Sequence, residues 1–436
     1  MPRPAPGSGS TTVTPAPEAV LEPWSDAWMA REGRKFIDDT PYRRAALEHA
    51  LTNHDNVYSR VRLNSYGHGE RGWDKLPVWT PRTLPVTAEV AAQLAKGEMP
   101  EPAKAPMWDG VEPTTTEGWV ALGRRVFFEF PMRAEVFMEW GLQKPTIADA
   151  VGIQRTATGE IPGLVVFANV DGNTRVGITC AICHSTVKDG ATLAGSSRRA
   201  FDYGRLRLEY FKDTREYVDP QLAVRMASWG PGRADVTEDD DEDPVTIPDL
   251  WGLRSQTWLT QAGTIRHDSP LALAIRQETQ LTDSNHALVR PPRALAWALA
   301  MYVYSLTPPA ETIASTPQLV RGGELFAENC KSCHANAAYG GKAIAAAAIG
   351  TNPSLATGRG RGTGNYRVPP LVRVRDGAPF LHDGSVASLD ELLSPARLAP
   401  GYTKGMLGPG PILGHRAGTD LGAVDRRALI AFLGTL

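Results

Sequence analysis

The feature that most constrains this chain is a pair of identically spaced C-x-x-C-H motifs, which together contain all four of its cysteines. The motif residues are Cys180, Cys183 and His184 in the first copy, and Cys330, Cys333 and His334 in the second. With this spacing, two thiols can add to the vinyl groups of one haem while the adjacent imidazole ligates its iron. The chain is therefore expected to carry two covalently attached haem c groups, with the two motif histidines as proximal ligands.

Two other chemistries also use C-x-x-C pairs. A zinc site would combine both pairs into one four-cysteine centre, but the pairs of structural zinc sites usually lie about 12–20 residues apart. The two pairs of this chain are separated by far more sequence. A dithiol redox site needs neither a histidine after each pair nor a second copy. Haem attachment is therefore the favoured interpretation.

Length and composition are those of an ordinary globular protein. The 436 residues, 42% hydrophobic and 22% charged, suffice for two or three domains. The formal net charge of −2 gives no general attraction to nucleic acid, so no nucleic-acid partner is expected. The most apolar stretch, residues 294–306, is shorter than the roughly 18–20 residues of a membrane helix, so no membrane span is expected either.

Covalent haem attachment takes place outside the cytoplasm, so we expect a periplasmic or secreted protein. Residues 1–20 contain no apolar run of the kind found in signal peptides, and their Pro, Ser and Thr content is typical of a flexible arm. Our hypothesis is that an export signal was removed, or that it lies upstream of the assigned start.

A similar series of elements occurs twice along the chain. Each copy opens with a G-x-x-[VL]-F pattern on a predicted helix, beginning at Gly123 in the first and at Gly322 in the second. Each then contains its C-x-x-C-H motif and closes with an apolar helix. The predicted fold class is mainly α, with two cytochrome c-like haem domains, many loops and an N-terminal extension.

The domain boundaries follow from this repeat. They are a flexible arm (1–20), an N-terminal extension without an assigned chemistry (21–115), a first haem domain (116–306), a linker (307–316) and a second haem domain (317–436). Thr316 and Pro317 form a typical helix start at the last boundary. The first haem domain also holds a long insertion before Cys180, in which the β-branched run 161–167 is expected to form a small hairpin.

The second copy resembles known haem proteins. Residues 321–334 look like the opening of a class I cytochrome c. The segments YRVPPL (366–371) and APFLHDGS (378–385), followed by Ser388 and Leu389, are similar to the dihaem cytochrome c peroxidase superfamily. That superfamily includes the dihaem rubber oxygenases and the enzyme that matures methylamine dehydrogenase. The resemblance covers roughly residues 118–436 and implies two haem domains packed face to face, with one haem accepting electrons and the other handling an oxidant.

The sixth coordination position of each iron decides whether a haem only exchanges electrons or also binds a small molecule. For the second haem the candidate ligands are His415, Met406 and His382. His415 is preferred because its segment GHRAGT resembles the distal ligand region of the rubber oxygenases, and Met406, in a Gly/Pro-rich loop, is the alternative. The resemblance to the peroxidases implies that His382 belongs to a loop at the haem interface and does not bind iron.

For the first haem the sequence departs from the peroxidase pattern. No histidine occurs between His184 and His267, so the distal histidine expected soon after the first motif is missing. His267, Met226 and His68 are candidate ligands, and an open position fits the sequence equally well. The alternative for His267 is an ordinary polar loop residue.

Two further features belong to the expected interface. The resemblance implies an aromatic bridge between the haems, for which Trp251 and Trp258 are candidates, although core packing is a slightly favoured alternative. The family often carries an interdomain Ca²⁺ ion, and the acidic run 238–243 offers oxygen ligands. That run lacks the glycine and terminal glutamate of an EF-hand, so a solvated loop is favoured over a calcium site.

Three classes of function remain. An electron-transfer dihaem cytochrome, working with a redox partner protein or a small electron donor, requires the fewest assumptions. A dihaem peroxidase or oxygenase also requires an open iron position at the first haem. A haem-based sensor requires a partner that the sequence does not reveal, and it ranks third.

Overall fold

The computed structural model describes residues 21–235 and 243–436. Helices account for 42% of the chain and strands for 10%, which confirms the predicted mainly α class. Within the described residues, no helix is long and apolar enough to cross a membrane.

The elements follow one another in three sets. The α-helices are α1 (Asp26–Asp38), α2 (Thr40–Ala50), α3 (Val57–Ser65), α4 (Ala88–Ala95), α5 (Thr116–Glu129), α6 (Val136–Leu142), α7 (Pro145–Ala150), α8 (Ala181–His184), α9 (Tyr203–Thr214), α10 (Pro220–Trp229), α11 (Pro270–Ser284), α12 (Arg293–Ser305), α13 (Pro317–Asn329), α14 (Ala346–Ile349), α15 (Ser354–Thr357), α16 (Leu389–Leu392) and α17 (Ala423–Leu433). The strands are β1 (Thr83–Pro85), β2 (Arg133–Ala134), β3 (Leu164–Ala168), β4 (Thr174–Ile178), β5 (Ser185–Lys188), β6 (Ala191–Ala194), β7 (Arg233–Ala234), β8 (Val245–Thr246), β9 (Trp258–Leu259), β10 (Ile265–Arg266), β11 (Ile344–Ala345) and β12 (Asn365–Tyr366). Short 3-10 helices are η1 (Gly72–Lys75), η2 (Leu253–Ser255), η3 (Val374–Asp376) and η4 (Pro395–Leu398).

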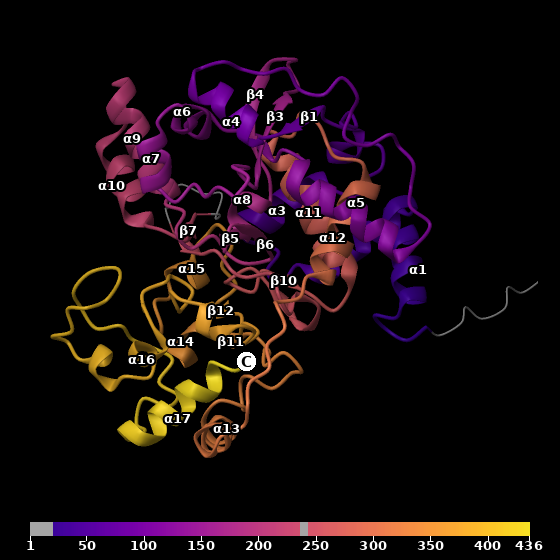
Figure 1. The fold of residues 1–436 in the computed structure, drawn as a ribbon. Helices are drawn as coiled ribbons and strands as arrows, with labels where there is room; N and C mark the ends of the chain where they lie inside the picture. Colours follow the sequence, from indigo (N-terminus) through magenta and orange to yellow (C-terminus); the bar gives the residue numbers. More distant parts are fainter. Residues whose placement is uncertain (1–20, 236–242) are drawn as a thin grey trace, which may run out of the picture.

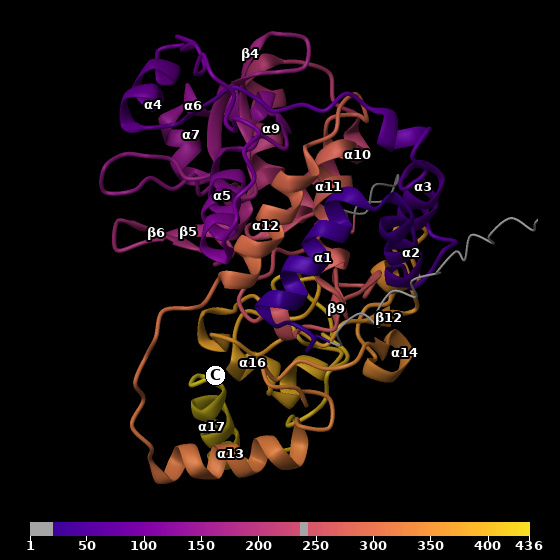
Figure 2. The same ribbon diagram turned by 90° about the vertical axis from the view of Figure 1, so that its right-hand side faces the viewer.

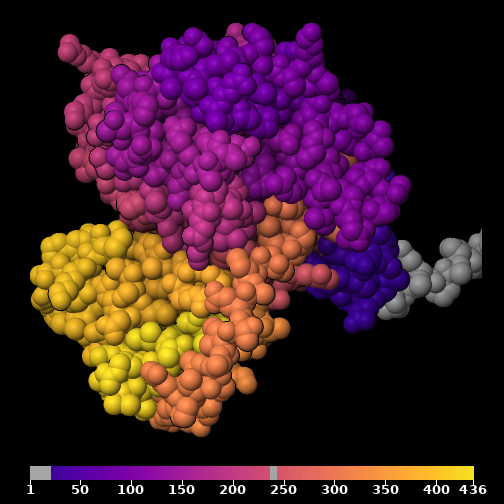
Figure 3. Space-filling model, viewed as in Figure 1, coloured from indigo at the N-terminus to yellow at the C-terminus, as the bar shows by residue number. Residues whose placement is uncertain are grey.

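These elements form two bodies, which Figure 1 separates by colour. The larger one contains the helices α1 to α12, and the smaller one contains α13 to α17. Figure 3 shows the two bodies in contact along a broad boundary. The chain passes between them through residues 306–316, and Figure 2 shows this linker running along the outside of the molecule to α13. Glu311 holds the linker in place through ion pairs with Arg373 and Arg375 of the smaller body.

The same helix pair organises both bodies. In the larger body α5 crosses α12 at Gly123, where an added Cβ would lie 1.8 Å from the carbonyl oxygen of Ala298. In the smaller body α13 crosses α17 at Gly322, where an added Cβ would lie 2.2 Å from the carbonyl oxygen of Ala428. Only glycine permits backbones to approach so closely. The two G-x-x-[VL]-F patterns therefore mark equivalent helix crossings, and both predicted closing helices are confirmed.

Aromatic residues one turn along the opening helices extend each crossing. Phe127 of α5 lies 5.2 Å from Tyr302 of α12, measured between ring centroids, and Phe326 of α13 lies 5.5 Å from Phe432 of α17. The predicted start of α13 is also confirmed, because the Thr316 hydroxyl accepts a hydrogen bond from the Leu319 N–H.

The run 161–167, expected to form a small hairpin, supplies only one strand of it, because β3 begins at Leu164 and its partner β4 lies beyond the run. Strands β3 and β4 pair antiparallel, and β1 and β2 complete a sheet in the order β1-β3-β4-β2. All five residues of β3 are buried. One edge strand, β1, comes from the N-terminal extension, since Thr83 pairs with Phe167.

The N-terminal helices share the main core of the larger body. Gly33 of α1 lies directly against the Trp297 indole of α12, and the Phe36 ring lies 6.1 Å from that indole, between centroids. Both Phe36 and Trp297 are almost completely buried. Residues 26–65 are therefore packed into the larger body.

Candidate functional site

The first C-x-x-C-H motif forms the short helix α8 and the residues on either side of it. The Nδ1 atom of His184 donates a hydrogen bond to the carbonyl oxygen of Pro248, at 3.0 Å. A carbonyl only accepts, so this bond places the proton on Nδ1 and leaves the Nε2 lone pair available to a metal. Burial lowers the pKa of His184 to about 4, which keeps the imidazole neutral at physiological pH.

The cysteines of the first motif are surrounded by protein. Burial raises the pKa of the Cys180 thiol to about 12 and that of Cys183 to about 11. Redox-active or metal-binding C-x-x-C pairs have lowered thiol pKa values, because the thiolate is the reactive form. Both thiols are also free of any disulfide. Their surroundings thus fit covalent attachment better than thiol-disulfide exchange.

A buried arginine fixes the backbone of this motif. Arg198, fully buried, donates from Nε to the Ser185 carbonyl oxygen at 3.0 Å and from one terminal nitrogen to the Pro162 carbonyl oxygen at 2.8 Å. Gly163, with a φ of +95°, allows the start of β3 to lie against Ile182 of α8. An added Cβ at this glycine would lie 2.1 Å from the Ile182 nitrogen.

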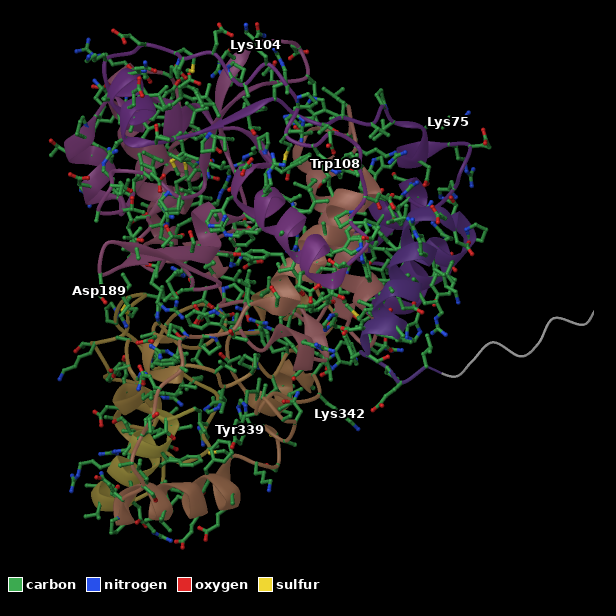
Figure 4. All side chains as sticks on the ribbon, turned by 45° about the vertical axis from the view of Figure 1, so that its right-hand side comes forward. Lys75, Lys104, Trp108, Asp189, Tyr339 and Lys342 are labelled. Carbon is green, nitrogen blue, oxygen red and sulfur yellow. The ribbon has the colours of Figure 1, made fainter. Side chains whose placement is uncertain are left out.

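The second motif follows α13 directly and has the same histidine geometry. The Nδ1 atom of His334 donates to the carbonyl oxygen of Tyr339 at 2.6 Å, which again leaves Nε2 for a metal. Burial lowers the pKa of His334. Figure 4 labels Tyr339 in the smaller body, next to α13. Cys333 is exposed, in contrast to the other three cysteines, so the second motif reaches the protein surface.

A cavity of about 330 Å³ lies beside the second motif, at the boundary between the two bodies. Its walls include Cys330, Cys333 and His334 together with His415. The remaining wall is largely apolar, and its apolar residues from the smaller body include Phe326, Ile344, Ile349, Val368, Leu371, Val374, Phe380, Leu389, Leu392, Leu393 and Leu433. The cavity therefore combines the two thiols and the imidazoles of His334 and His415, among others, with a mainly apolar lining.

His415 faces this cavity from the loop between η4 and α17. Burial lowers its pKa to about 4, and the nearby His334 imidazole contributes to the same shift. Its Nδ1 atom is buried and has no hydrogen-bond partner among the described residues. A buried polar atom without a partner costs free energy. The His415 imidazole would therefore gain from a polar group or metal that enters the cavity and interacts with it.

The other two candidate ligands of the second haem lie in different surroundings. The Met406 side chain is 47% exposed and lines a separate, more polar cavity of about 450 Å³, not the one beside His334. His382 lines both cavities. Its ring stacks on Tyr366 at 4.2 Å between centroids, and its backbone carbonyl oxygen accepts a hydrogen bond from the Thr246 N–H of the larger body. His382 therefore joins the two bodies at the wall of the cavity.

Both ring nitrogens of His267 are hydrogen-bonded to residues outside the two motifs. Its Nδ1 is hydrogen-bonded to the carbonyl oxygen of Gln256 and its Nε2 to the Tyr304 hydroxyl, both at 2.6 Å. Both ring nitrogens are hydrogen-bonded and the side chain is buried, so neither nitrogen is available to a motif. The structure thus gives His267 a place in the core and offers no geometry for iron ligation there.

Trp251 occupies the boundary between the two motifs. It is 1% exposed, donates from its indole nitrogen to the Ala194 carbonyl oxygen at 3.2 Å, and lines the cavity that holds His334. Three residues before it, Pro248 binds His184 and lines the same cavity. Segment 248–251 therefore touches the first motif on one side and the cavity of the second on the other.

The two motifs are not assembled into one metal centre. Within residues 21–235 and 243–436, no three His, Cys, Asp or Glu side chains are placed to hold a metal ion together. The four-cysteine zinc alternative consequently has no geometric support in this part of the chain. The acidic run proposed for calcium lies outside the described residues except for Asp243.

Three site residues were not predicted from the sequence. They are Pro248, the acceptor for His184, the partly buried Arg367 and the fully buried Arg397. Arg367 lines the cavity and donates to the amide oxygens of Gln256, at 2.9 Å, and Gln261, at 3.1 Å. Burial lowers its pKa to about 10. A single sequence contains no local signal for such long-range contacts.

Two solved structures show weak similarity to this chain. A MauG-like protein associated with microbial copper homeostasis is 19% identical over 49% of this chain and 80% of its own, with a TM-score of 0.33. The hydrazine synthase of Kuenenia stuttgartiensis is 13% identical over 78% of this chain and 98% of its own, also with a TM-score of 0.33. At this TM-score neither structure establishes a shared fold. No protein-family model and no curated protein matches the chain.

Proposed function

We propose that this chain is a dihaem c-type cytochrome that transfers electrons through two covalently bound haems, in the periplasm or outside the cell. Haem bound at the two motifs supplies one-electron redox chemistry. The contribution of the protein is to hold each haem, to set its ligands and to connect the two sites.

The residues beside the second motif fit a haem. The cavity offers two thiols for attachment, the His334 Nε2 as proximal ligand and the His415 imidazole as distal ligand. The Arg367 guanidinium suits a haem propionate, because a partly buried cation hydrogen-bonded to neutral amide oxygens gains from an anionic partner. Met406, in its separate cavity, does not enter the proposal.

The first motif supports a haem through the same histidine geometry. The two motif histidines each donate from Nδ1 to a backbone carbonyl oxygen, of Pro248 and of Tyr339 respectively. Such bonds orient a ligating imidazole and fix its tautomer. The shared helix crossings at Gly123 and Gly322 further support two equivalent haem domains.

The observation that carries the proposal is the segment between the sites. Pro248 binds the proximal histidine of the first motif, while Pro248 and Trp251 both line the cavity of the second. A short and continuous piece of protein, which includes the buried Trp251, therefore joins the two proposed haems. This arrangement suits electron transfer between them, with Trp251 as the aromatic residue of the bridge.

A second candidate function is a dihaem peroxidase or oxygenase acting at an open first haem. It is favoured by the state of His267, whose two ring nitrogens are already hydrogen-bonded. One imidazole candidate for the sixth position of the first haem, His267, is therefore engaged elsewhere.

Carbon monoxide binding to the dithionite-reduced protein separates the two functions, because CO binds only an iron with an open or easily vacated position. A pure electron carrier is expected to bind less than stoichiometric CO. Rapid uptake of one CO per chain would contradict the carrier and support the enzyme. The same sample, titrated stepwise with reductant, should show two haem reduction waves.

A further inference from the structure

The loop that carries His415 is held by one buried side chain. Arg397 of η4 is fully buried and donates four hydrogen bonds to backbone carbonyl oxygens. Its Nε donates to Leu392 at 2.9 Å, one terminal nitrogen to Ile412 at 2.5 Å, and the other to Gly414 at 2.9 Å and to His415 itself at 2.8 Å. Three of these four acceptors belong to the segment 412–415.

The backbone held in this way is strained. Gly414 has a φ of +81° and His415 a φ of +44°, so two consecutive residues are left-handed. This conformation is unfavourable for a residue with a side chain and persists only where the surroundings impose it. Two contacts impose it at His415: its N–H donates to the Ile349 carbonyl oxygen at 3.0 Å, and its carbonyl oxygen accepts from Arg397.

We propose that Arg397 is a positioning residue, which keeps the His415 imidazole at the cavity as the distal ligand of the second haem. The inference rests on the proposed haem at the second motif. Arg397 neither lines the cavity nor touches the proposed iron position, so it acts through the backbone of the ligand. Without it, the strained segment would relax and the His415 imidazole would withdraw from the cavity, so that it could not ligate the iron of a haem bound there.

The shape of the guanidinium matters to this role. Its planar fork presents five N–H donors in a fixed geometry, whereas a lysine offers three donors at a single point. Arg397→Gln should therefore release the loop, and Arg397→Lys should restore part of the wild-type coordination. A purely structural contribution to stability would not produce this graded change in the haem spectrum.

The experiment uses the full chain, matured in a host that attaches haem c, as wild type and as Arg397→Gln, Arg397→Lys, His415→Ala and Arg373→Gln. Arg373 is the matched control, because it is a buried arginine of the same body that binds the carboxylates of Asp376 and Glu311. The measurements are the ferric high-spin fraction and the number of CO molecules bound by the reduced protein.

Arg397→Gln and His415→Ala are each expected to gain a high-spin haem and to bind one more CO per chain than wild type. The high-spin fraction and CO count of Arg397→Lys should lie between those of wild type and Arg397→Gln. Arg373→Gln should have the wild-type values. A haem-loaded Arg397→Gln protein with the wild-type spectrum and CO count would overturn the inference. If the glutamine variant fails to mature, an unchanged Arg397→Lys protein overturns it in the same way. Wild-type protein without haem would instead refute the proposed function.

Discussion

At the scale of single residues, three fully or partly buried arginines define the candidate site. Arg198 binds the backbone around the first motif, Arg397 binds the His415 loop, and Arg367 lines the cavity of the second motif. The first two bind carbonyl oxygens and therefore fix backbone geometry. Arg367 differs, because its guanidinium lies at the cavity wall and is bound to side-chain amides.

This position predicts the effect of Arg367→Gln. A partly buried cation beside the second haem would favour its reduced state, since reduction removes one positive charge from the iron. Removing the cation should lower the midpoint potential by about 59 mV, equivalent to about tenfold in the redox equilibrium constant. Spectroelectrochemical titration measures this. Arg416→Gln is the control, because Arg416 lines the same cavity but is exposed, so solvent screens its charge. Equal shifts of the midpoint potential in the two variants would contradict the placement of Arg367 beside the second haem.

His267 predicts a pH dependence of stability. Burial lowers its pKa in the folded protein, whereas in the unfolded chain it lies near about 6.5. Below that pH the unfolded state binds a proton that the folded state excludes, so stability is complete above about pH 6.5 and falls as the pH decreases. Relative to His267→Gln, the wild type should lose up to about 1.4 kcal/mol per pH unit in this window. Urea unfolding of both proteins at several pH values measures this loss. If the free energy of unfolding of the wild type and of His267→Gln changed in parallel with pH, the prediction would be wrong.

At the scale of elements, the molecule depends on two equivalent helix crossings. Both place a glycine of the opening helix against a carbonyl oxygen of the closing helix, and both place an aromatic ring one turn further on. In the smaller body the crossing also supports the cavity, because α13 leads directly into Cys330 and Leu433 of α17 lines the wall. The packing of α13 against α17 therefore helps to place residues that line the cavity.

The α13 and α17 crossing can be tested with two neighbouring glycines. An added Cβ at Gly322 would lie 2.2 Å from the Ala428 carbonyl oxygen, whereas at Gly323 the nearest atom is 3.4 Å away on the Phe432 ring. Gly322→Ala should lower the free energy of unfolding by about 1–3 kcal/mol, because the helices must separate. Gly323→Ala should be neutral or stabilising by up to about 1 kcal/mol, because alanine favours helix. Chemical denaturation measures both, and equal effects would count against the crossing.

At the scale of the whole molecule, the two bodies meet where the candidate sites lie. Segment 248–251 of the larger body reaches the cavity wall formed by the smaller body, and the His382 carbonyl oxygen binds Thr246 across the boundary. The linker only runs along the surface, fastened by Glu311. Contacts around the cavity, rather than the linker, therefore bring the motifs together.

Local patterns in the sequence predicted the opening and closing helices, the α13 cap and the extended run that contains β3, because each depends on residues close together in the chain. The His415 segment was also identified, and the structure places it beside His334. Long-range contacts were not predictable in this way. The acceptor for His184 lies 64 residues away, and the partners of His267 depend on the packing of α12.

The proposed function depends on two covalently bound haems, one at each motif. The most direct test is intact mass spectrometry of the chain matured in a cytochrome-competent host, with Cys180→Ala/Cys183→Ala and Cys330→Ala/Cys333→Ala variants alongside. If a haem is attached at each motif, the mass should increase by two haems in the wild type and by one haem in each double variant. A wild-type chain with the bare polypeptide mass, or pigment that acidified acetone extracts completely, would contradict it.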